Sequence, residues 1–112
     1  MLILEKRSPI FSDLKFVLKA RGKDKAKPIF NKVQIEDGYE CKMVVCSDAH
    51  RLHLLHDHTG MFEGMKNGQY DVIKSDASQI VLSYSVEQDQ YPNIKQIIPK
   101  AEEFRADLLE VI

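Results

Sequence analysis

The feature that most constrains the fold is the dipeptide Asp37-Gly38, which separates two runs of alternating apolar and polar residues. Asp-Gly is among the strongest short-range signals for a tight hairpin turn, because both residues tolerate the left-handed backbone that such a turn needs. The first run covers residues 28–36 and the second covers residues 39–46. The sequence therefore predicts an antiparallel hairpin in this part of the chain.

One amphipathic helix is predicted upstream of the hairpin. Ser8-Pro9 is a good helix entry, because serine can accept a bond from an unpaired amide and proline has its φ angle already set for the first turn. The segment is predicted to be helical to about Arg21 and to stop at Gly22. The apolar side chains that fall on one side of this helix are Phe11, Leu14, Val17 and Leu18, whereas Ser12, Lys15 and Lys19 fall on another.

The rest of the chain shows mainly strand patterns. Further strands are predicted at residues 2–6, 51–56, 69–74 and 80–86, with turns at 47–50 and 75–78. The predicted fold class is α+β, with one amphipathic helix packed on a mainly antiparallel sheet in the order β-α-β-β-β plus further strands. A chain of 112 residues is close to the commonest size of one domain.

The segment at the C-terminal end, residues 102–112, reads like a strand that runs into the first turn of a helix. Two interpretations stay open. A following unit begins near Phe104, or the segment folds back on the sheet. We therefore divide the chain into a domain at residues 1–99 and a C-terminal extension, or the start of a following unit, at residues 100–112.

Positive charge is concentrated in one segment, although the formal net charge of the chain is only −1. Between Ser12 and Lys27 there are six basic and two acidic residues, so one edge of the fold is expected to be basic. Such a run is either a solvated face or a surface that binds phosphates. The six candidates for DNA contact are Lys15, Lys19, Arg21, Lys23, Lys25 and Lys27.

Several function classes receive little support from the sequence. The longest apolar stretches fall far short of the roughly 20 residues needed to cross a bilayer, and the first residues lack the pattern of a signal peptide, so we expect a cytoplasmic protein without membrane contact. Cys41 and Cys46 are the two cysteines, and they are predicted to lie in one strand, five residues apart and on opposite faces. A disulfide between them is not expected.

No enzymatic chemistry is predicted. The four histidines fall at positions 50, 53, 56 and 58, but in a strand they would divide between two faces, and their spacing is not that of a known zinc motif. Asp48 beside His50 is better explained by backbone hydrogen bonds of a turn than by acid-base catalysis. We found no nucleophile elbow or glycine loop for phosphate, so we expect a non-enzyme without metal or cofactor.

Three segments, in order along the chain, carry a resemblance to a known family. Residues 27–35 (KPIFNKVQI), 44–52 (VVCSDAHRL) and 90–99 (QYPNIKQIIP) resemble the "RPILNGVLIE", "ATDGHRL" and "GxFPDYxxVIP" stretches of the beta sliding clamp of bacterial DNA polymerase III. The resemblance covers most of residues 2–99. A clamp domain of that family has two similar strand-helix-strand units, whereas residues 59–91 of this chain show strand patterns and no second helix.

The resemblance implies a clamp-like module of DNA replication that contacts double-stranded DNA without reading its sequence, self-associates, and binds short peptides of replication proteins. The residues that match the family's peptide pocket are Ser47, Ala49, His50, Arg51, Leu52, Pro92, Gln96 and Ile97. The alternative is a protein-interaction or regulatory domain that has kept the clamp fold but lost ring formation and DNA binding.

Overall fold

The computed structural model describes residues 1–22, 31–38, 40–48, 50–88 and 108–111. Within this part of the chain there is one α-helix, and the remaining regular structure is extended. In chain order the elements are β1 (Leu2–Glu5), α1 (Phe11–Leu18), β2 (Val33–Asp37), β3 (Lys42–Ser47), β4 (Leu52–Asp57), β5 (Gly68–Ser75), β6 (Gln79–Tyr84) and β7 (Leu108–Val111).

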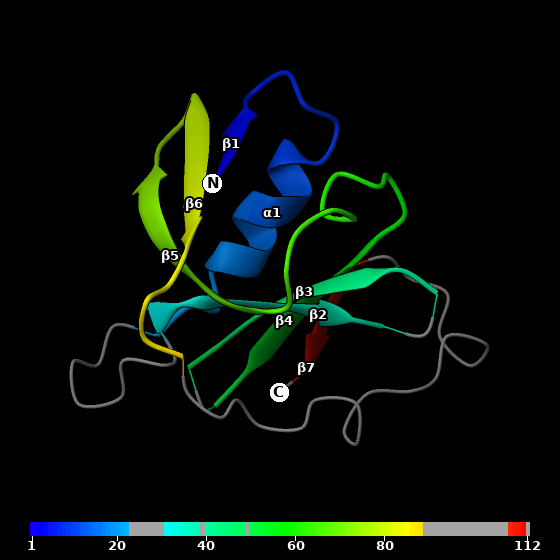
Figure 1. The fold of residues 1–112 in the computed structure, drawn as a ribbon, viewed down its shortest axis with the longest axis vertical. Helices are drawn as coiled ribbons and strands as arrows, with labels where there is room; N and C mark the ends of the chain where they lie inside the picture. Colours follow the sequence, from blue (N-terminus) through cyan, green and yellow to red (C-terminus); the bar gives the residue numbers. More distant parts are fainter. Residues whose placement is uncertain (23–30, 39, 49, 89–107, 112) are drawn as a thin grey trace.

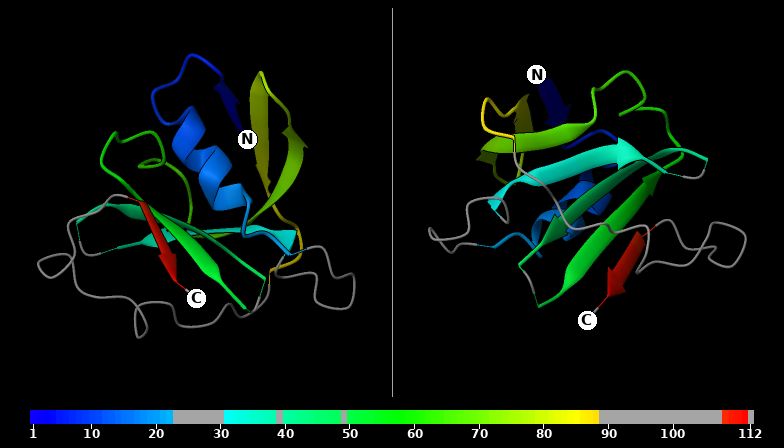
Figure 2. Two further views of the ribbon diagram at one scale, coloured as in Figure 1. Left: turned by 180° about the vertical axis from the view of Figure 1, so that it is seen from behind. Right: turned by 60° about the horizontal axis from the view of Figure 1, so that its bottom comes forward.

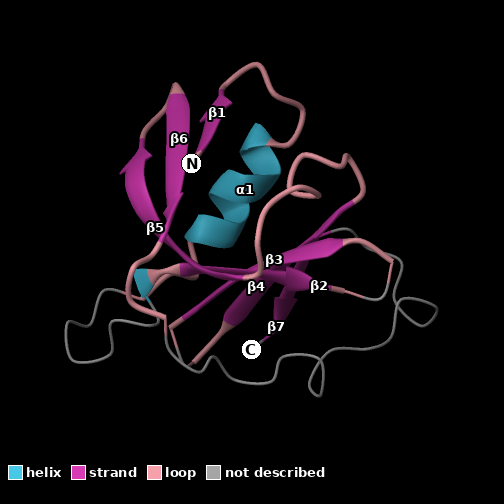
Figure 3. Ribbon diagram, in the orientation of Figure 1, coloured by secondary structure: helices cyan, strands magenta, loops and turns pink. Residues whose placement is uncertain are grey.

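The strands form one sheet in the order β1-β6-β5-β2-β3-β4-β7, and every neighbouring pair is antiparallel. The sheet is curled, so that α1 lies between its β1-β6-β5 part and its β2-β3-β4-β7 part (Figures 1 and 2). Figure 3 distinguishes the helix from the strands that surround it. The predicted α+β class, with one helix on an antiparallel sheet, is confirmed.

The curl of the sheet depends on β5, which belongs to both of its parts. The first residues of β5 pair with β2, and the strand then continues in pairing with β6 after a register shift between Val72 and Lys74. A shift of this kind bends a strand and increases its twist. Gly68 begins β5 with a φ of +143°, and a Cβ there would lie 2.8 Å from a ring carbon of Tyr84. The bend therefore brings β6 close to the start of β5.

The predicted hairpins are present. Asp37 ends β2, and the connection to β3 begins at Gly38, whose N–H donates a hydrogen bond of 2.8 Å to the Cys41 carbonyl. Gly38 does not have the left-handed backbone that the sequence predicts, so the hairpin is confirmed but the tight Asp-Gly turn is wrong. Between β5 and β6, the Asp76 carboxylate accepts from the backbone amides of Ser78 and Gln79. These amides hold the pKa of Asp76 down at about 2, so its carboxylate stays ionised and closes the turn at neutral pH.

The helix is shorter than predicted at both ends. It begins at Phe11 rather than at Ser8-Pro9, and its N-cap residue, Ile10, makes no side-chain capping bond. It ends at Leu18, although the next turn continues with a bond from Arg21 N–H to the Leu18 carbonyl. The entry signal was misplaced because the Ser8-Pro9 turn precedes the helix rather than opening it.

The core lies between α1 and the inner face of the curled sheet. The helix contributes two fully buried side chains, Leu14 and Val17, and Ala20, just after the helix, is also fully buried. The largest fully buried side chains from the sheet and its loops include Leu4, Ile35, Leu55, Phe62, Ile80 and Leu82. Phe62 belongs to the loop after β4, and its amide donates 2.8 Å to the Asp57 carboxylate, which holds this loop against the core.

Residues 108–111 of the predicted C-terminal segment form β7, which pairs with β4 along Leu52–Leu55. The described part of this segment is therefore a strand of the same sheet. All six residues of β4 are buried, so neither of its faces is a solvent face.

We expect Leu14→Ala to lower the free energy of unfolding by about 2 to 5 kcal/mol, because it removes a side chain with no exposed surface and leaves a cavity between helix and sheet. Urea denaturation would measure the change. Ser12→Ala is the matched control on the exposed side of the same helix, and it should change the free energy by less than about 0.5 kcal/mol. Equal effects from both variants would contradict this placement of α1.

Candidate functional site

The C-terminal end of α1 brings one residue from each predicted site together. Arg51, in the turn before β4, donates a hydrogen bond of 2.6 Å from Nη2 to the carbonyl oxygen of Lys19. Lys19 was predicted to contact DNA, and Arg51 was predicted to contact a peptide. Both side chains are exposed, so basic groups from two parts of the chain share this end of the helix.

The turn between β3 and β4 is built around the carboxylate of Asp48. Its Oδ1 accepts from the backbone amides of His50 at 2.9 Å and of Arg51 at 3.0 Å, and its Oδ2 lies 3.4 Å from Nε of Arg51. Ser47 Oγ donates to the Arg51 carbonyl at 2.8 Å. The local backbone bonds expected for Asp48 are confirmed, and they orient Arg51 toward the helix.

The same bonds set the charge of the turn. The amide of His50 makes the largest contribution to a lowered pKa for Asp48. Burial opposes it as the second largest effect, and the amide and guanidinium of Arg51 lower the pKa further. Asp48 is therefore a carboxylate at neutral pH, and it balances part of the positive charge of Arg51.

A second side chain, that of His53 in β4, contacts the last turn of α1. The ring of His53 stacks on the ring of Phe16, with centroids 4.1 Å apart and planes at 8°. Its Nδ1 lies 2.7 Å from the Phe16 carbonyl oxygen, and its Nε2 lies 2.6 Å from Oε2 of Glu110 in β7. The Phe16 carbonyl already accepts from Lys19 N–H at 3.1 Å. The last carbonyls of a helix carry partial negative charge, so Arg51 and the His53 ring both contact the negative end of α1.

Lys15 and Arg21, which are also predicted to contact DNA, do not form one patch with Lys19 and Arg51. Lys15 points toward the end of β5, where Nζ lies 3.3 Å from Ser75 Oγ and 5.8 Å from the ring centre of Phe11. Arg21 Nη1 lies 3.5 Å from the Asn31 carbonyl oxygen. Three further candidates lie outside the described residues: Lys23, Lys25 and Lys27.

The residues predicted to line a peptide pocket include both buried and exposed side chains, and some lie outside the described part of the chain. Ser47 and Leu52 are buried at the ends of β3 and β4, whereas His50 and Arg51 are exposed. Four residues of this set lie outside the described part of the chain: Ala49, Pro92, Gln96 and Ile97. In the described part, His50 and Arg51 are therefore the members that a partner molecule could reach.

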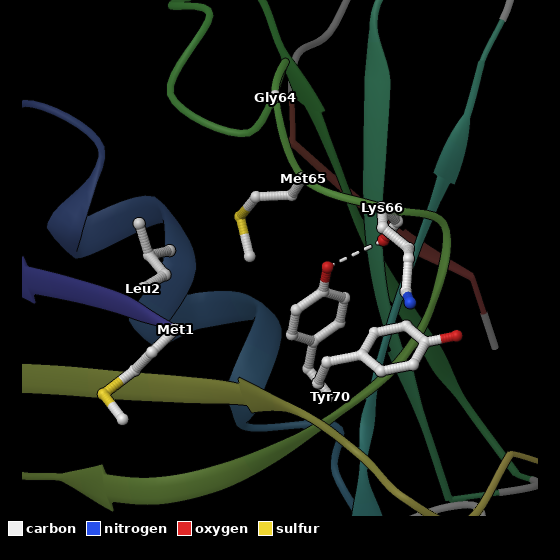
Figure 4. A pocket seen from close by; sticks show the side chains of 7 residues that line it. Met1, Leu2, Gly64, Met65, Lys66 and Tyr70 are labelled. Atoms are coloured by element: carbon white, nitrogen blue, oxygen red, sulfur yellow. Dashed lines mark hydrogen bonds between the residues drawn. The ribbon is translucent and has the colours of Figure 1, made fainter.

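A cavity of about 340 Å³ lies elsewhere, between the start of β1, the loop before β5, and the two tyrosines of β5 and β6 (Figure 4). Two of its polar side-chain groups already have partners within the protein. Tyr70 donates from its hydroxyl to the Lys66 carbonyl at 2.7 Å, and the Lys66 ammonium lies 4.1 Å from the centre of the Tyr84 ring. Binding sites usually direct a few available polar groups at their ligand. This cavity contains none of the residues predicted for DNA or peptide contact.

The described residues contain no group of three or more histidine, cysteine, aspartate or glutamate side chains that could hold a metal ion. His56 and His58 have their ring centres 6.4 Å apart, while His53 is held by helix and β7. Burial raises the pKa of the Cys46 thiol to about 12, an effect that the charge of Arg21 opposes only in part. Cys46 is thus a neutral core residue rather than a nucleophile at neutral pH.

No helix among the described residues is long and apolar enough to pass through a membrane. Comparisons with protein-family models, with curated proteins and with solved structures found no match for this chain. The resemblance to the sliding clamp therefore stays a prediction that rests on the three sequence segments.

Sequence reasoning missed the contact between His53 and Glu110. Their positions are 57 residues apart, and no local pattern indicates that they meet. A usable signal was the single polar residue among the apolar side chains of Leu52, Leu54 and Leu55, because a histidine in a buried strand needs hydrogen-bond partners.

Asp48→Asn should reduce the free energy of unfolding near neutral pH. It should also make that free energy change less as the pH falls into the acid range. The pKa of Asp48 is lower in the folded protein than its ordinary value of 3.8, so its stabilising effect is complete above that pH and is lost as the pH falls through the folded-state pKa. Urea denaturation across a pH series should show the difference in unfolding free energy between wild type and variant shrinking in acid.

The control for this series is Glu63→Gln, which removes an exposed carboxylate from a different loop. It should follow the wild-type curve. A difference between wild type and Asp48→Asn that does not change with pH would show that the lost charge is not what stabilises the turn.

Proposed function

We propose that this chain is a DNA sliding-clamp-like module that contacts duplex DNA without reading its sequence. The observation that carries the proposal is the basic end of α1, where exposed Lys19 lies beside exposed Arg51 on a helix packed against an antiparallel sheet. The resemblance of the three sequence segments to the beta sliding clamp supports the same function.

The proposed contact needs positive charge on a rigid support and little else. Lys15 lies in α1 and Lys19 is its C-cap residue four positions later, so the two lysines start from neighbouring turns, while the Lys15 ammonium is directed toward Ser75. Lysine and arginine neutralise phosphates and release the condensed counterions, which gives affinity that falls steeply with salt and does not depend on sequence. Lys15, Lys19 and Arg51 are the described groups that would make this contact.

The element order from β1 through α1 to β4 agrees with the strand-helix-strand-strand-strand order expected of a clamp half-domain. Residues 50–88 contain strands and turns but no second helix. The described part of one chain would therefore supply one helix to a DNA-facing surface, and a ring would need several copies. The terminal strands of the sheet, β1 and β7, are the edges at which further copies could add.

The alternative function, an interaction domain that keeps this fold without binding DNA, is favoured by the internal partners of Arg51. Its guanidinium contacts both the Asp48 carboxylate and the Lys19 carbonyl, so part of its charge is already compensated. In that case His50 and Arg51 would contact a partner peptide, as the family's pocket residues do, instead of supporting a phosphate contact.

The double variant Lys15→Gln/Lys19→Gln should weaken binding to duplex DNA and reduce its salt dependence. Each lost phosphate contact removes about 0.9 from the slope of log affinity against log salt concentration, so two contacts would remove about 1.8. Fluorescence anisotropy of labelled duplexes of two unrelated sequences would measure both affinity and slope, and the two sequences should give the same values.

Lys6→Gln is the matched control, since Lys6 is an exposed lysine in the turn that follows β1. Equal losses from the control and from the double variant would mean that charge alone, and not the face of α1, attracts DNA. Absence of binding by the wild-type chain at low salt, with a monomeric mass in light scattering with and without DNA, would favour the interaction domain.

A further inference from the structure

The buried side chain of His53 joins three elements through its two ring nitrogens. Only 2% of the residue is exposed, and its ring lies against Phe16 of α1. Nδ1 faces the carbonyl oxygen of Phe16 at 2.7 Å, and Nε2 faces the carboxylate of Glu110 at 2.6 Å. The side chain of Glu110 is 40% exposed, so its other side meets solvent.

These two partners restrict the protonation state of the ring. A backbone carbonyl oxygen only accepts hydrogen bonds, and an ionised carboxylate also only accepts them. A neutral imidazole has one N–H donor, so it can satisfy one of the two oxygens but would direct a lone pair at the other. With Glu110 ionised, both contacts are hydrogen bonds at once only if both nitrogens carry a proton, which makes the ring an imidazolium paired with Glu110.

We propose that His53 and Glu110 form a pH-sensitive latch that holds β7 on the edge of β4. When both groups are charged, the imidazolium donates one bond to the end of α1 and one to β7. When the ring loses a proton, the bond to Glu110 or the bond to Phe16 must be lost. When Glu110 gains a proton in acid, the ion pair is lost instead. The hold on β7 is therefore strongest at a pH between these two events.

The pairing of β7 in the sheet explains why this one contact should have a large effect on how firmly β7 is held. β7 has four residues, and among the described residues it pairs with β4 alone. Glu110 is directly opposite His53 in that pairing. Loss of a charge-assisted hydrogen bond within so short a strand should loosen the whole strand, because few other bonds hold it to β4.

The charged and titratable groups around His53 come from each element that packs on it. Glu110 of β7 favours the charged ring. Arg51 lies in the turn before β4, two residues before His53, and Lys19 and Arg21 follow α1. A further positive charge near such cations is electrostatically disfavoured. The Cys46 thiol of β3, which is directly opposite His53 in the sheet, is neutral near pH 7 because burial raises its pKa. Glu110 thus supplies the negative charge that offsets these cations.

The direct test is the nitrogen chemical shift of the His53 ring in the whole chain, measured by long-range ¹H–¹⁵N correlation. Protonated and unprotonated ring nitrogens have well-separated shifts. We expect both nitrogens of His53 to show protonated shifts at neutral pH and to lose this pattern as the pH rises. One protonated and one unprotonated nitrogen at neutral pH and below would overturn the proposal.

A second measurement follows β7 itself through amide hydrogen exchange of residues 108–111. Glu110→Ala should speed their exchange by about 10- to 100-fold, the range expected for a lost bond to a charged group. Glu110→Gln keeps an acceptor without the charge, so it should retain part of the protection but lose its dependence on pH between about pH 5 and pH 8, where histidine titrates.

His50→Gln is the control, because it removes an exposed histidine from the adjacent turn and leaves the latch intact. Its β7 amides should behave as in the wild type at every pH. If Glu110→Ala leaves exchange in β7 unchanged, β7 does not depend on the latch and the proposal fails. Because the Glu110 variants alter an exposed edge residue rather than His53, they test the latch without removing a buried side chain.

Discussion

The contact between the last turn of α1 and β4 is the interaction on which the rest of the structure depends. A short helix has unsatisfied carbonyls at its C-terminal end, and they must find donors if that end is to be covered by a sheet. Arg51, in the turn before β4, donates to the Lys19 carbonyl, and the His53 ring of β4 contacts the Phe16 carbonyl, which also accepts from Lys19 N–H. These bonds fix the helix end to β4, while Leu14 and Val17 bury its other face in the curled sheet.

Much of this arrangement could be predicted because its signals are local. Asp37-Gly38 correctly marked a hairpin, although Asp37 ends β2 and Gly38 lacks the left-handed backbone of a tight Asp-Gly turn. The turn after β3 closes through the Asp48 carboxylate, which accepts from amides two and three residues ahead. The apolar spacing of α1 correctly placed Leu14 and Val17 in the core. Its ends were less certain, since Ser8-Pro9 is a good helix entry in isolation but forms the turn before Phe11.

What the sequence could not indicate are contacts between distant positions. Alternation predicts one buried and one exposed face for a strand, yet both faces of β4 are buried. Nothing near His53 in the sequence shows that Glu110 will stand opposite it. The basic run was identified from composition, but composition does not show that Lys15 turns toward Ser75 while Lys19 stays exposed beside Arg51.

The proposed DNA contact and the proposed latch use the same end of α1 but different chemistry. Lys19 would act through its exposed ammonium, whose attraction to phosphate is screened by salt. His53 acts through two short bonds in a site from which water is largely excluded, where screening by salt is weak. Salt and pH therefore separate the two: raising salt should release DNA while β7 stays in place, and raising pH should loosen β7 while the charge of Lys19 is unchanged.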